Sequence, residues 1–255
     1  GKQMSKTILV IPDTQVKPGI DFNYLNHIGQ YIVDKEPDVI VHLGDHWDMP
    51  SLSSFDFGKR QYEGRRYLND IDAGNFGMDT LLNPMRIMNF RRRVNAKKQY
   101  RPEMHFLLGN HEERIQRAVN SDAKLEGLIG YKDLNLEDWK VHPFLKVLEV
   151  EGVAFSHYFT TGVAGRPAST ANAMLNKKHQ SCIAGHQQGR QVATAYKANG
   201  EPITAIIAGS AYPHEEDYLG AQGNKHWRGI VVLHEVENGS FDEMFVSLKY
   251  LEKKY

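Results

Sequence analysis

The sequence has little cysteine, no net charge and no long apolar run, and each absence narrows the class of protein. Its one cysteine, Cys182, has no partner for an internal disulfide, so we expect a buried, unreactive thiol and no need for an oxidising compartment. Lysine and arginine number 31, as do aspartate and glutamate, so overall charge does not indicate a polyanionic partner. No apolar run is long enough to cross a bilayer, and the first residues lack a signal-peptide core. We therefore expect a soluble, cytoplasmic protein with no membrane partner.

Short apolar runs recur along the 255 residues and predict a layered α/β fold. Helical patterns separate the early runs; one has Leu25, Ile28 and Ile32 on a single face and Asp21 as its N-cap. Near the end of the chain, "ENGS" predicts a hairpin turn. We expect a single domain over residues 4–255. The predicted strands are "TILVIP", "DVIVHLG", "MHFLLG", "GVAFSH", "SCIAGH", "ITAIIAGS" and "GIVVLHEV".

Residues 47–102 are too many for a simple connection between two strands, so we expect a partly helical insertion there. The insertion is rich in basic side chains, namely Lys59, Arg60, Arg65, Arg66, Arg86, Arg91, Arg92, Arg93, Lys97, Lys98 and Arg101. Aromatic side chains are interleaved with them, namely Phe55, Phe57, Tyr62, Tyr67, Phe76, Phe90 and Tyr100. This combination suits a nucleic-acid backbone and unstacked bases. The alternative is a solvated helix face whose apolar side, with Leu81, Leu82, Met85, Met88 and Phe90, is partly core.

Polar side chains follow five of the predicted strands at the point where each strand ends. In chain order these are Asp13 and Gln15 in "DTQ", Asp45 and Asp48 in "GDHWD", Asn110 and His111 in "GNHEER", His157 in "SH", and His186 and Gln188 in "GHQQ". In layered α/β proteins such strand ends meet at a crevice where ligands bind. Each residue alone has an ordinary explanation as a cap, a turn residue or a structural histidine. Neighbouring carboxylates are costly to bury without a cation, so the whole set favours a metal cluster.

This ordered set resembles the calcineurin-like metallophosphoesterases. Their usual pattern is D-x-H, G-D, G-N-H-[ED], H and G-H-x-H, and the resemblance extends from Asp13 to Gln188. It implies an α/β fold, a layered β-sandwich flanked by helices, and hydrolysis of phosphoesters by two metal ions. A compact catalytic domain with "PDTQ" also resembles phage-encoded members of this family.

The resemblance also implies a role for each motif residue. Asp45 would bridge two divalent ions. One ion would be completed by Asn110, His157 and His186, and the other by Asp13, Gln15 and Gln188. His111 would not bind metal; it would lie beside the scissile phosphate and help to protonate the leaving oxygen.

Gln15 and Gln188 depart from the family pattern, because both stand where histidine is usual and both fall on the same ion. Amide oxygens are harder donors than imidazole, so this ion site becomes rich in oxygen. Such a site favours Mn²⁺, with Mg²⁺ or mixed occupancy as alternatives, over Zn²⁺. Asp48 is either an outer partner or extra ligand of this site, or a helix cap.

Three functions are compatible with the sequence. We favour a metal-dependent phosphodiesterase, a nuclease that acts on DNA, because the basic insertion joins two of the metal-ligand loops. The alternatives are a phosphomonoesterase or small-nucleotide hydrolase, and a binding module without catalysis. Arg114 and Arg190 follow two of the motifs and either face the phosphate or form structural ion pairs. The sequence indicates no oligomeric state.

Overall fold

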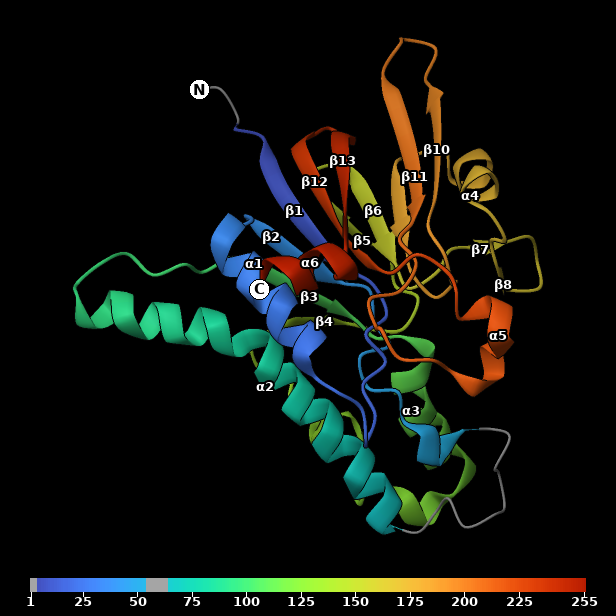
Figure 1. Cartoon of the computed structure of the whole chain (residues 1–255). Helices are drawn as coiled ribbons and strands as arrows, with labels where there is room; N and C mark the ends of the chain where they lie inside the picture. The colour runs from blue at the N-terminus through green and yellow to red at the C-terminus, as the bar shows by residue number, and fades with distance from the viewer. Residues whose placement is uncertain (1–3, 54–63) are drawn as a thin grey trace.

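The computed structural model describes residues 4–53 and 64–255, and it shows two large β-sheets and one two-stranded sheet, with helices around them (Figure 1). The expected fold class, an α/β layered sandwich with flanking helices, is confirmed. Among the described residues, no helix is both long and apolar enough to cross a membrane. Part of the basic insertion lies outside the described residues, namely Phe55, Phe57, Lys59, Arg60 and Tyr62.

The first sheet carries the first three motifs at its strand ends. Strands β1 to β4 run parallel, because helical or partly helical segments connect them, and β12 and β13 extend the sheet in antiparallel fashion. Asn238 and Gly239, both with positive φ, form the predicted hairpin turn between β12 and β13. The strand order is β13 (Ser240–Ser247), β12 (Gly229–Glu237), β1 (Lys6–Ile11), β2 (Val39–His42), β3 (Glu103–Leu107) and β4 (Lys140–His142).

The second sheet carries the last two motifs. Its central strands β6, β9 and β11 are parallel, and antiparallel strands lie at both edges. The order is β10 (Gln191–Tyr196), β11 (Pro202–Ile207), β9 (Cys182–Ala184), β6 (Val153–Ser156) and β5 (Leu148–Val150). A small separate pair comprises β7 (Thr160–Thr161) and β8 (Arg166–Pro167).

Apolar side chains from both sheets pack against each other and form the core of the sandwich. Ile8, Val10 and Val41 of the first sheet belong to one buried cluster with Phe155 and Ile183 of the second. Their strands read as nearly continuous apolar runs because both faces of each strand are covered, as is usual for parallel sheets. Helix α4 (Ala171–Lys178) covers the outer face of the second sheet.

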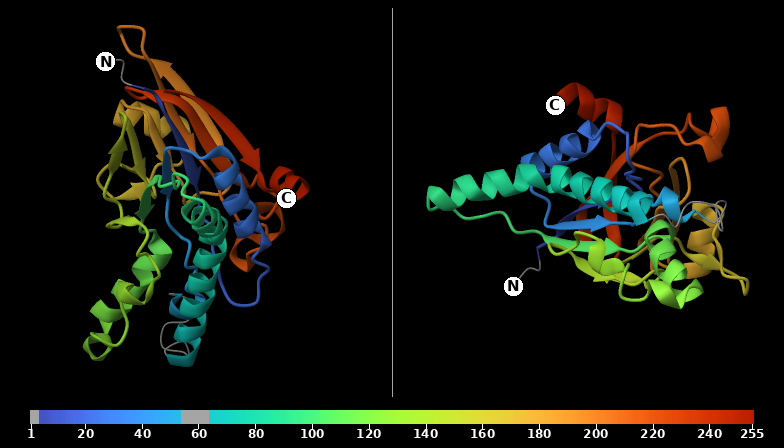
Figure 2. Two further views of the ribbon diagram at one scale, coloured as in Figure 1. Left: turned by 90° about the vertical axis from the view of Figure 1, so that its left-hand side faces the viewer. Right: turned by 90° about the horizontal axis from the view of Figure 1, so that it is seen from below.

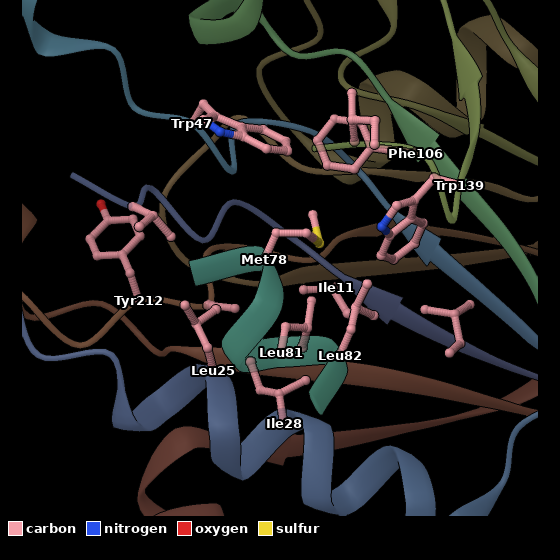
Figure 3. Close-up of a cluster of buried hydrophobic side chains, with 14 of the residues drawn as sticks. Ile11, Leu25, Ile28, Trp47, Met78, Leu81, Leu82, Phe106, Trp139 and Tyr212 are labelled. Carbon is pink, nitrogen blue, oxygen red and sulfur yellow. The ribbon is translucent and has the colours of Figure 1, made fainter. Parts of the chain in front are cut away.

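The outer face of the first sheet is covered by α1 (Asn23–Lys35), α2 (Gly64–Val94) and α6 (Leu248–Lys254), as Figures 1 and 2 show. The predicted face of α1 is buried at Leu25, Ile28 and Ile32. Asp21 accepts the N–H of Asn23, so it stabilises the helix start from one residue before the N-cap position. Figure 3 shows Leu25 and Ile28 near Met78, Leu81 and Leu82 of α2 in this core.

Helix α2 forms most of the insertion, which the sequence predicts to be partly helical. Its apolar side chains Leu81 and Leu82 are buried, so the helix is part of the core as well as a charged surface. Pro84 lies inside α2, where it removes a backbone N–H and favours a bend; Figure 1 shows the helix changing direction. Gly29 of α1 lets the two helices approach, because a Cβ there would lie 2.4 Å from the carbonyl oxygen of Leu81.

The remaining helices surround the carboxyl ends of the strands. Helix α3 begins at the third motif and packs beside short 3₁₀ segments. A loop containing η6 and α5 follows β11 and reaches the same region. Their bounds are α3 (Asn110–Ser121), α5 (Gly220–Gly223), η1 (Pro50–Leu52), η4 (Ala123–Leu125), η5 (Tyr131–Asp133) and η6 (Asp217–Leu219).

Candidate metal centre

The strand-end motifs converge on one cavity of about 430 Å³. Since β1, β2 and β3 are parallel, as are β6 and β9, the residues that follow them meet at one edge of the sandwich. His157 lies directly beneath the lining and is fully buried. The lining residues are Asp13, Gln15, Asp45, Asn110, His111, His186, Gln187, Gln188, Tyr218 and Leu219.

Asp45, Asn110, His157 and His186 form the most compact group of donors. His157 Nε2 lies 3.1 Å from Asp45 Oδ2 and 2.8 Å from Asn110 Oδ1. Asn110 Oδ1 is also 3.1 Å from His186 Nδ1. Ligand atoms of Asp45, His157 and His186 all lie within 4.8 Å of one another. This arrangement of two oxygen and two nitrogen donors fits a divalent cation.

The second nitrogen of His157 orients the ring for such a role. Its Nδ1 donates to the carbonyl oxygen of Leu43 at 2.7 Å, so Nε2 points into the cluster. Burial lowers the pKa of His157, but the Asp45 and Asp13 carboxylates and its hydrogen bonds raise it to about 10. A divalent ion competes with that proton for the same nitrogen, because metal binding requires neutral imidazole.

Asp13, Gln15 and Gln188 form the other half of the site. Asp13 is 1% exposed, and its Oδ1 accepts the backbone N–H of His186 at 3.0 Å. Burial raises the pKa of Asp13 to about 7, and the Asp45 carboxylate also raises it, against the lowering effect of His157. A buried carboxylate with a raised pKa gains stabilisation from a cation beside it. Each of these three side chains carries an oxygen of the kind that a hard ion prefers. In the structure, Gln188 Oε1 faces the hydroxyls of Ser210 and Tyr212, so an all-oxygen ion site here stays a prediction.

The site backbone is strained at three of the motif residues. Gln15, Asp45 and His186 have φ values of 38°, 59° and 68°, which residues with a Cβ rarely adopt. Each follows a strand end and turns its side chain or backbone toward the cavity. Strain of this kind persists only where the surrounding structure enforces it, and it clusters at functional sites.

His111 lies at the start of α3 and is oriented by Asp48. Its Nδ1 donates to the carbonyl oxygen of Asp48 at 2.8 Å, and the Asp48 carboxylate is 2.9 Å away. Nε2 is thereby turned toward Asp45 Oδ2, 3.8 Å away. Burial lowers the pKa of His111, but the Asp45 and Asp48 carboxylates raise it to about 9. Asp48 therefore orients His111, whereas its predicted role as an outer partner or ligand of a metal ion stays a prediction.

Arg114 and Arg190 do not line the cavity. Arg114 donates to the carbonyl oxygens of Asp48 and Met49, at 3.0 and 3.3 Å, and so holds the loop that supports His111. The guanidinium of Arg190 stacks on Trp227, 4.6 Å from the ring centroid. Arg190 thus has a packing role rather than the phosphate-facing position considered from the sequence.

Glu112 is a site residue that the sequence analysis missed. Its fully buried carboxylate accepts three backbone N–H groups, from Gly109 and Asp45 at Oε1 and from Trp47 at Oε2, each at 2.8 Å. It therefore fixes the loop that presents Asp45. The "GNHEER" motif contained the signal, but only as the residue after His111.

A second missed feature is a buried chain of polar side chains beneath Asp13 and Asp45. Thr14 Oγ1 lies 2.9 Å from His42 Nε2 and 2.8 Å from His46 Nδ1. The Gly44 N–H donates to His42 Nδ1, so His42 Nε2 donates to Thr14, whose hydroxyl donates to His46. Burial lowers the pKa of both histidines, that of His46 to about 4, so both rings are neutral. The chain ties the ends of β1 and β2 together.

Much of the basic insertion lies away from this cavity. Arg92 pairs with Glu36 at 2.7 Å, and Glu36 precedes β2 whereas Asp45 follows it. Arg91 to Arg93 therefore lie near the amino ends of the parallel strands, and the cavity lies at their carboxyl ends. Arg86 is also paired, with Asp79 and Asp138. Arg66 lies at the other end of α2, which is close to η1, and its side chain is exposed.

Comparison with known proteins gives limited similarity. No protein-family model matches the chain. Two phage proteins, each named Gene 54 protein, match 69 residues: that of Mycobacterium phage L5 is 42% identical and that of Mycobacterium phage D29 is 40% identical. The matched stretch is 27% of this chain and 27% of each relative, and neither name states an activity.

Two solved structures align with this chain over most of their length. YfcE, a phosphoesterase from E. coli, aligns with 95% of this chain and 99% of its own, at 12% identity and a TM-score of 0.35. The protein TT1561 of Thermus thermophilus aligns with 94% of this chain and 99% of its own, at 9% identity and a TM-score of 0.30. Neither TM-score is high enough to identify a shared fold.

Proposed function

We propose that the protein is a metal-dependent phosphoester hydrolase of the calcineurin-like, phage-type metallophosphoesterase kind. One observation carries this proposal: Asp45 lies between His157 and the Asp13 side of the cavity, with Asn110 and His186 completing a compact donor group. The motif order along the chain supports the same function.

Two divalent ions are the proposed cofactors, with manganese favoured. Asp45, Asn110, His157 and His186 would hold one; Asp13, Gln15 and Gln188, with Asp45, would hold the other. Bound there, such ions activate water and offset charge on the phosphate. His111 is the proposed proton donor to the leaving oxygen, because Nε2 faces the cavity while Asp48 fixes Nδ1. Glu112 and Arg114 hold the loops that present Asp45 and His111.

The donor set predicts a metal preference. Gln15 and Gln188 supply oxygen where imidazole is usual, so Mn²⁺ is expected to support faster turnover than Zn²⁺. The measurement is initial rate after metal stripping and titration with each ion, compared at equal bound metal. Faster turnover with Zn²⁺ at matched occupancy would contradict the donor argument, and Gln15→His is the variant expected to shift the preference toward Zn²⁺.

We further propose phosphodiesters of DNA as the substrate. The support is the basic sequence that follows the Asp45 loop along the chain and includes Lys59, Arg60 and Arg66. Each phosphate that such cations neutralise adds salt-dependent affinity. Charge reversal at these three positions is expected to weaken DNA cleavage and to flatten its dependence on salt. The matched control is reversal at Arg91 and Arg93, near the other end of the strands, which should leave DNA cleavage unchanged.

Hydrolysis of a small chromogenic diester separates binding from chemistry in these variants. It should be unchanged in both sets, because the donors of the metal centre are untouched. Equal loss of DNA cleavage and diester hydrolysis on reversal at Lys59, Arg60 and Arg66 would show that the segment is structural. Loss of DNA cleavage on reversal at Arg91 and Arg93 would place the nucleic-acid surface elsewhere on α2.

The alternative is hydrolysis of a phosphomonoester or small nucleotide, and the cavity itself favours it. At about 430 Å³ the cavity has the size of a small-molecule site, and Tyr218 and Leu219 line one side of it. A substrate panel distinguishes the two: plasmid DNA, single-stranded DNA, RNA, bis-p-nitrophenyl phosphate and p-nitrophenyl phosphate, each with Mn²⁺, Mg²⁺ or Zn²⁺. Turnover of the monoester without cleavage of DNA would establish the alternative, and no turnover of any substrate would contradict the proposed hydrolase.

A further inference from the structure

The side-chain amide of Gln188 is held by two hydroxyl groups on the side away from the cavity. In the structure, Gln188 Oε1 faces these hydroxyl groups and lies 3.1 Å from Ser210 Oγ and 3.1 Å from Tyr212 Oη. A half-turn of the amide about its terminal bond exchanges Oε1 with Nε2 at almost no steric cost. Which atom faces the hydroxyls is therefore decided by where their hydrogens go. That question is important for the proposed function, because an oxygen turned toward Ser210 and Tyr212 has no lone pair left for a metal ion.

His226 decides where the hydrogen of Ser210 goes. Nδ1 of His226 is in hydrogen-bond contact with the carbonyl oxygen of Gly223, and a carbonyl oxygen only accepts, so Nδ1 carries a hydrogen. A neutral imidazole has one N–H, which leaves Nε2 as an acceptor. Ser210 Oγ lies 2.7 Å from that Nε2. The Ser210 hydroxyl therefore donates to His226.

The surroundings of His226 disfavour a charged ring. Burial lowers its pKa, and Arg228 lowers it further, while the contact with Gly223 raises it, with a net shift downward. Arg228 itself is fixed by the carbonyl oxygens of Tyr212, His214 and Asn224, so its charge stays near the ring. A protonated His226 would reverse the chain, because both of its nitrogens would then donate.

Ser210 has only one hydrogen, and it is committed to His226. Its oxygen can then only accept from Gln188, and a Gln188 oxygen facing it would bring two acceptors together at 3.1 Å. The NH₂ group of an amide has two hydrogens, and two hydroxyl oxygens lie at equal distance from it. Tyr212 can accept one of them because its own hydrogen can point to Tyr218, with which it also shares a side-chain hydrogen bond.

We propose that Ser210 and His226 are positioning residues that turn the Gln188 amide so that Nε2 faces Ser210 and Tyr212 and Oε1 faces the metal centre. The proposal rests on the proposed function in one respect, namely that Oε1 serves there as a metal ligand. Ser210 and His226 lie 22 and 38 positions after Gln188 in the chain, and neither belongs to one of the five motifs.

The orientation is tested first without metal or substrate. In ¹⁵N-histidine-labelled protein at neutral pH, nitrogen chemical shifts report which ring nitrogen of each histidine carries the hydrogen. The His226 signals, identified by their loss in His226→Phe, should show protonated Nδ1 and unprotonated Nε2. A ring protonated at Nε2, alone or together with Nδ1, would overturn the proposal.

The consequence for metal binding is tested by titration with Mn²⁺. Ser210→Ala should weaken binding of the ion on the Gln188 side by about 10–100-fold, the usual cost of losing an outer partner of a metal ligand, and leave the ion at His157 unchanged. Ser181→Ala is the matched control, because it removes another buried serine hydroxyl away from the site. No weakening in Ser210→Ala would contradict the positioning role.

A second background separates orientation from general structural damage. In Gln188→Glu the two terminal oxygens are equivalent, so a half-turn changes nothing and the effect of Ser210→Ala on this ion should disappear. An equal loss in both backgrounds would show that Ser210 is merely structural and overturn the proposal. If the wild-type protein binds a single Mn²⁺, the two-ion part of the proposed function fails, and the His226 measurement alone decides the orientation of the amide.

Discussion

Asp45→Asn is expected to reduce metal-dependent hydrolysis by at least about 10³-fold, the upper end of what loss of one preorganised stabilising group costs. In the proposed site, Asp45 is the carboxylate that both ions share, and its Oδ2 lies 3.1 Å from His157 Nε2. In the wild type, Asp45 Oδ1 accepts the backbone N–H of His111 at 2.8 Å. Asparagine keeps an oxygen acceptor for this N–H, so the loop should keep its conformation. The measurements are initial rate at saturating Mn²⁺ and bound metal per chain.

Asp72→Asn is the control, because Asp72 is exposed on α2 and its substitution makes the same change of charge. It should retain wild-type rates. A cooperative thermal transition in metal-free Asp45→Asn would show that the fold persists while activity is lost. Wild-type turnover in Asp45→Asn would remove Asp45 from the catalytic centre.

His111→Ala is expected to keep both metal ions and to lose about 10²–10⁴-fold in rate, the range for a positioned proton donor. The loss should be largest for substrates with poor leaving groups, because these depend most on protonation of the departing oxygen. The structural reason is that His111 Nε2 faces Asp45 at 3.8 Å while Nδ1 is held by Asp48. The measurement is the dependence of rate on leaving-group pKa across a series of aryl phosphodiesters.

His179→Ala, at an exposed histidine, is the control for general effects of removing an imidazole, and it should follow the wild-type dependence. Metal content of His111→Ala gives the decisive comparison. A variant that loses metal but keeps the leaving-group dependence of the wild type would identify His111 as a ligand rather than a proton donor.

The convergence of the motifs was predictable because it follows from topology. Each motif lies where an apolar run ends, and parallel strands bring such ends to one edge, so Asp13, Asp45 and Asn110 had to be neighbours. The hairpin at Asn238 and Gly239 was predictable for a local reason, because those residue types accept positive φ.

Other parts of the site depend on contacts that no local pattern encodes. Glu112 receives N–H groups from Trp47 and Asp45, far away in the chain, and nothing in its spacing from Asn110 indicates this. The contact between Ser210 and His226 also depends on the path of the loop after β11. The placement of Arg91 to Arg93 depends on the length and direction of α2. Local propensity disfavours the continuation of this helix past Pro84.

The most direct test of the central claim is hydrolysis of bis-p-nitrophenyl phosphate by the full chain before and after removal of divalent ions. The stripped protein should be inactive, and re-addition of Mn²⁺ should restore turnover in proportion to metal bound, with no restoration in Asp45→Asn. Hydrolysis that persists in the stripped protein, or that Mn²⁺ restores equally in Asp45→Asn, would contradict a metal centre built on Asp45.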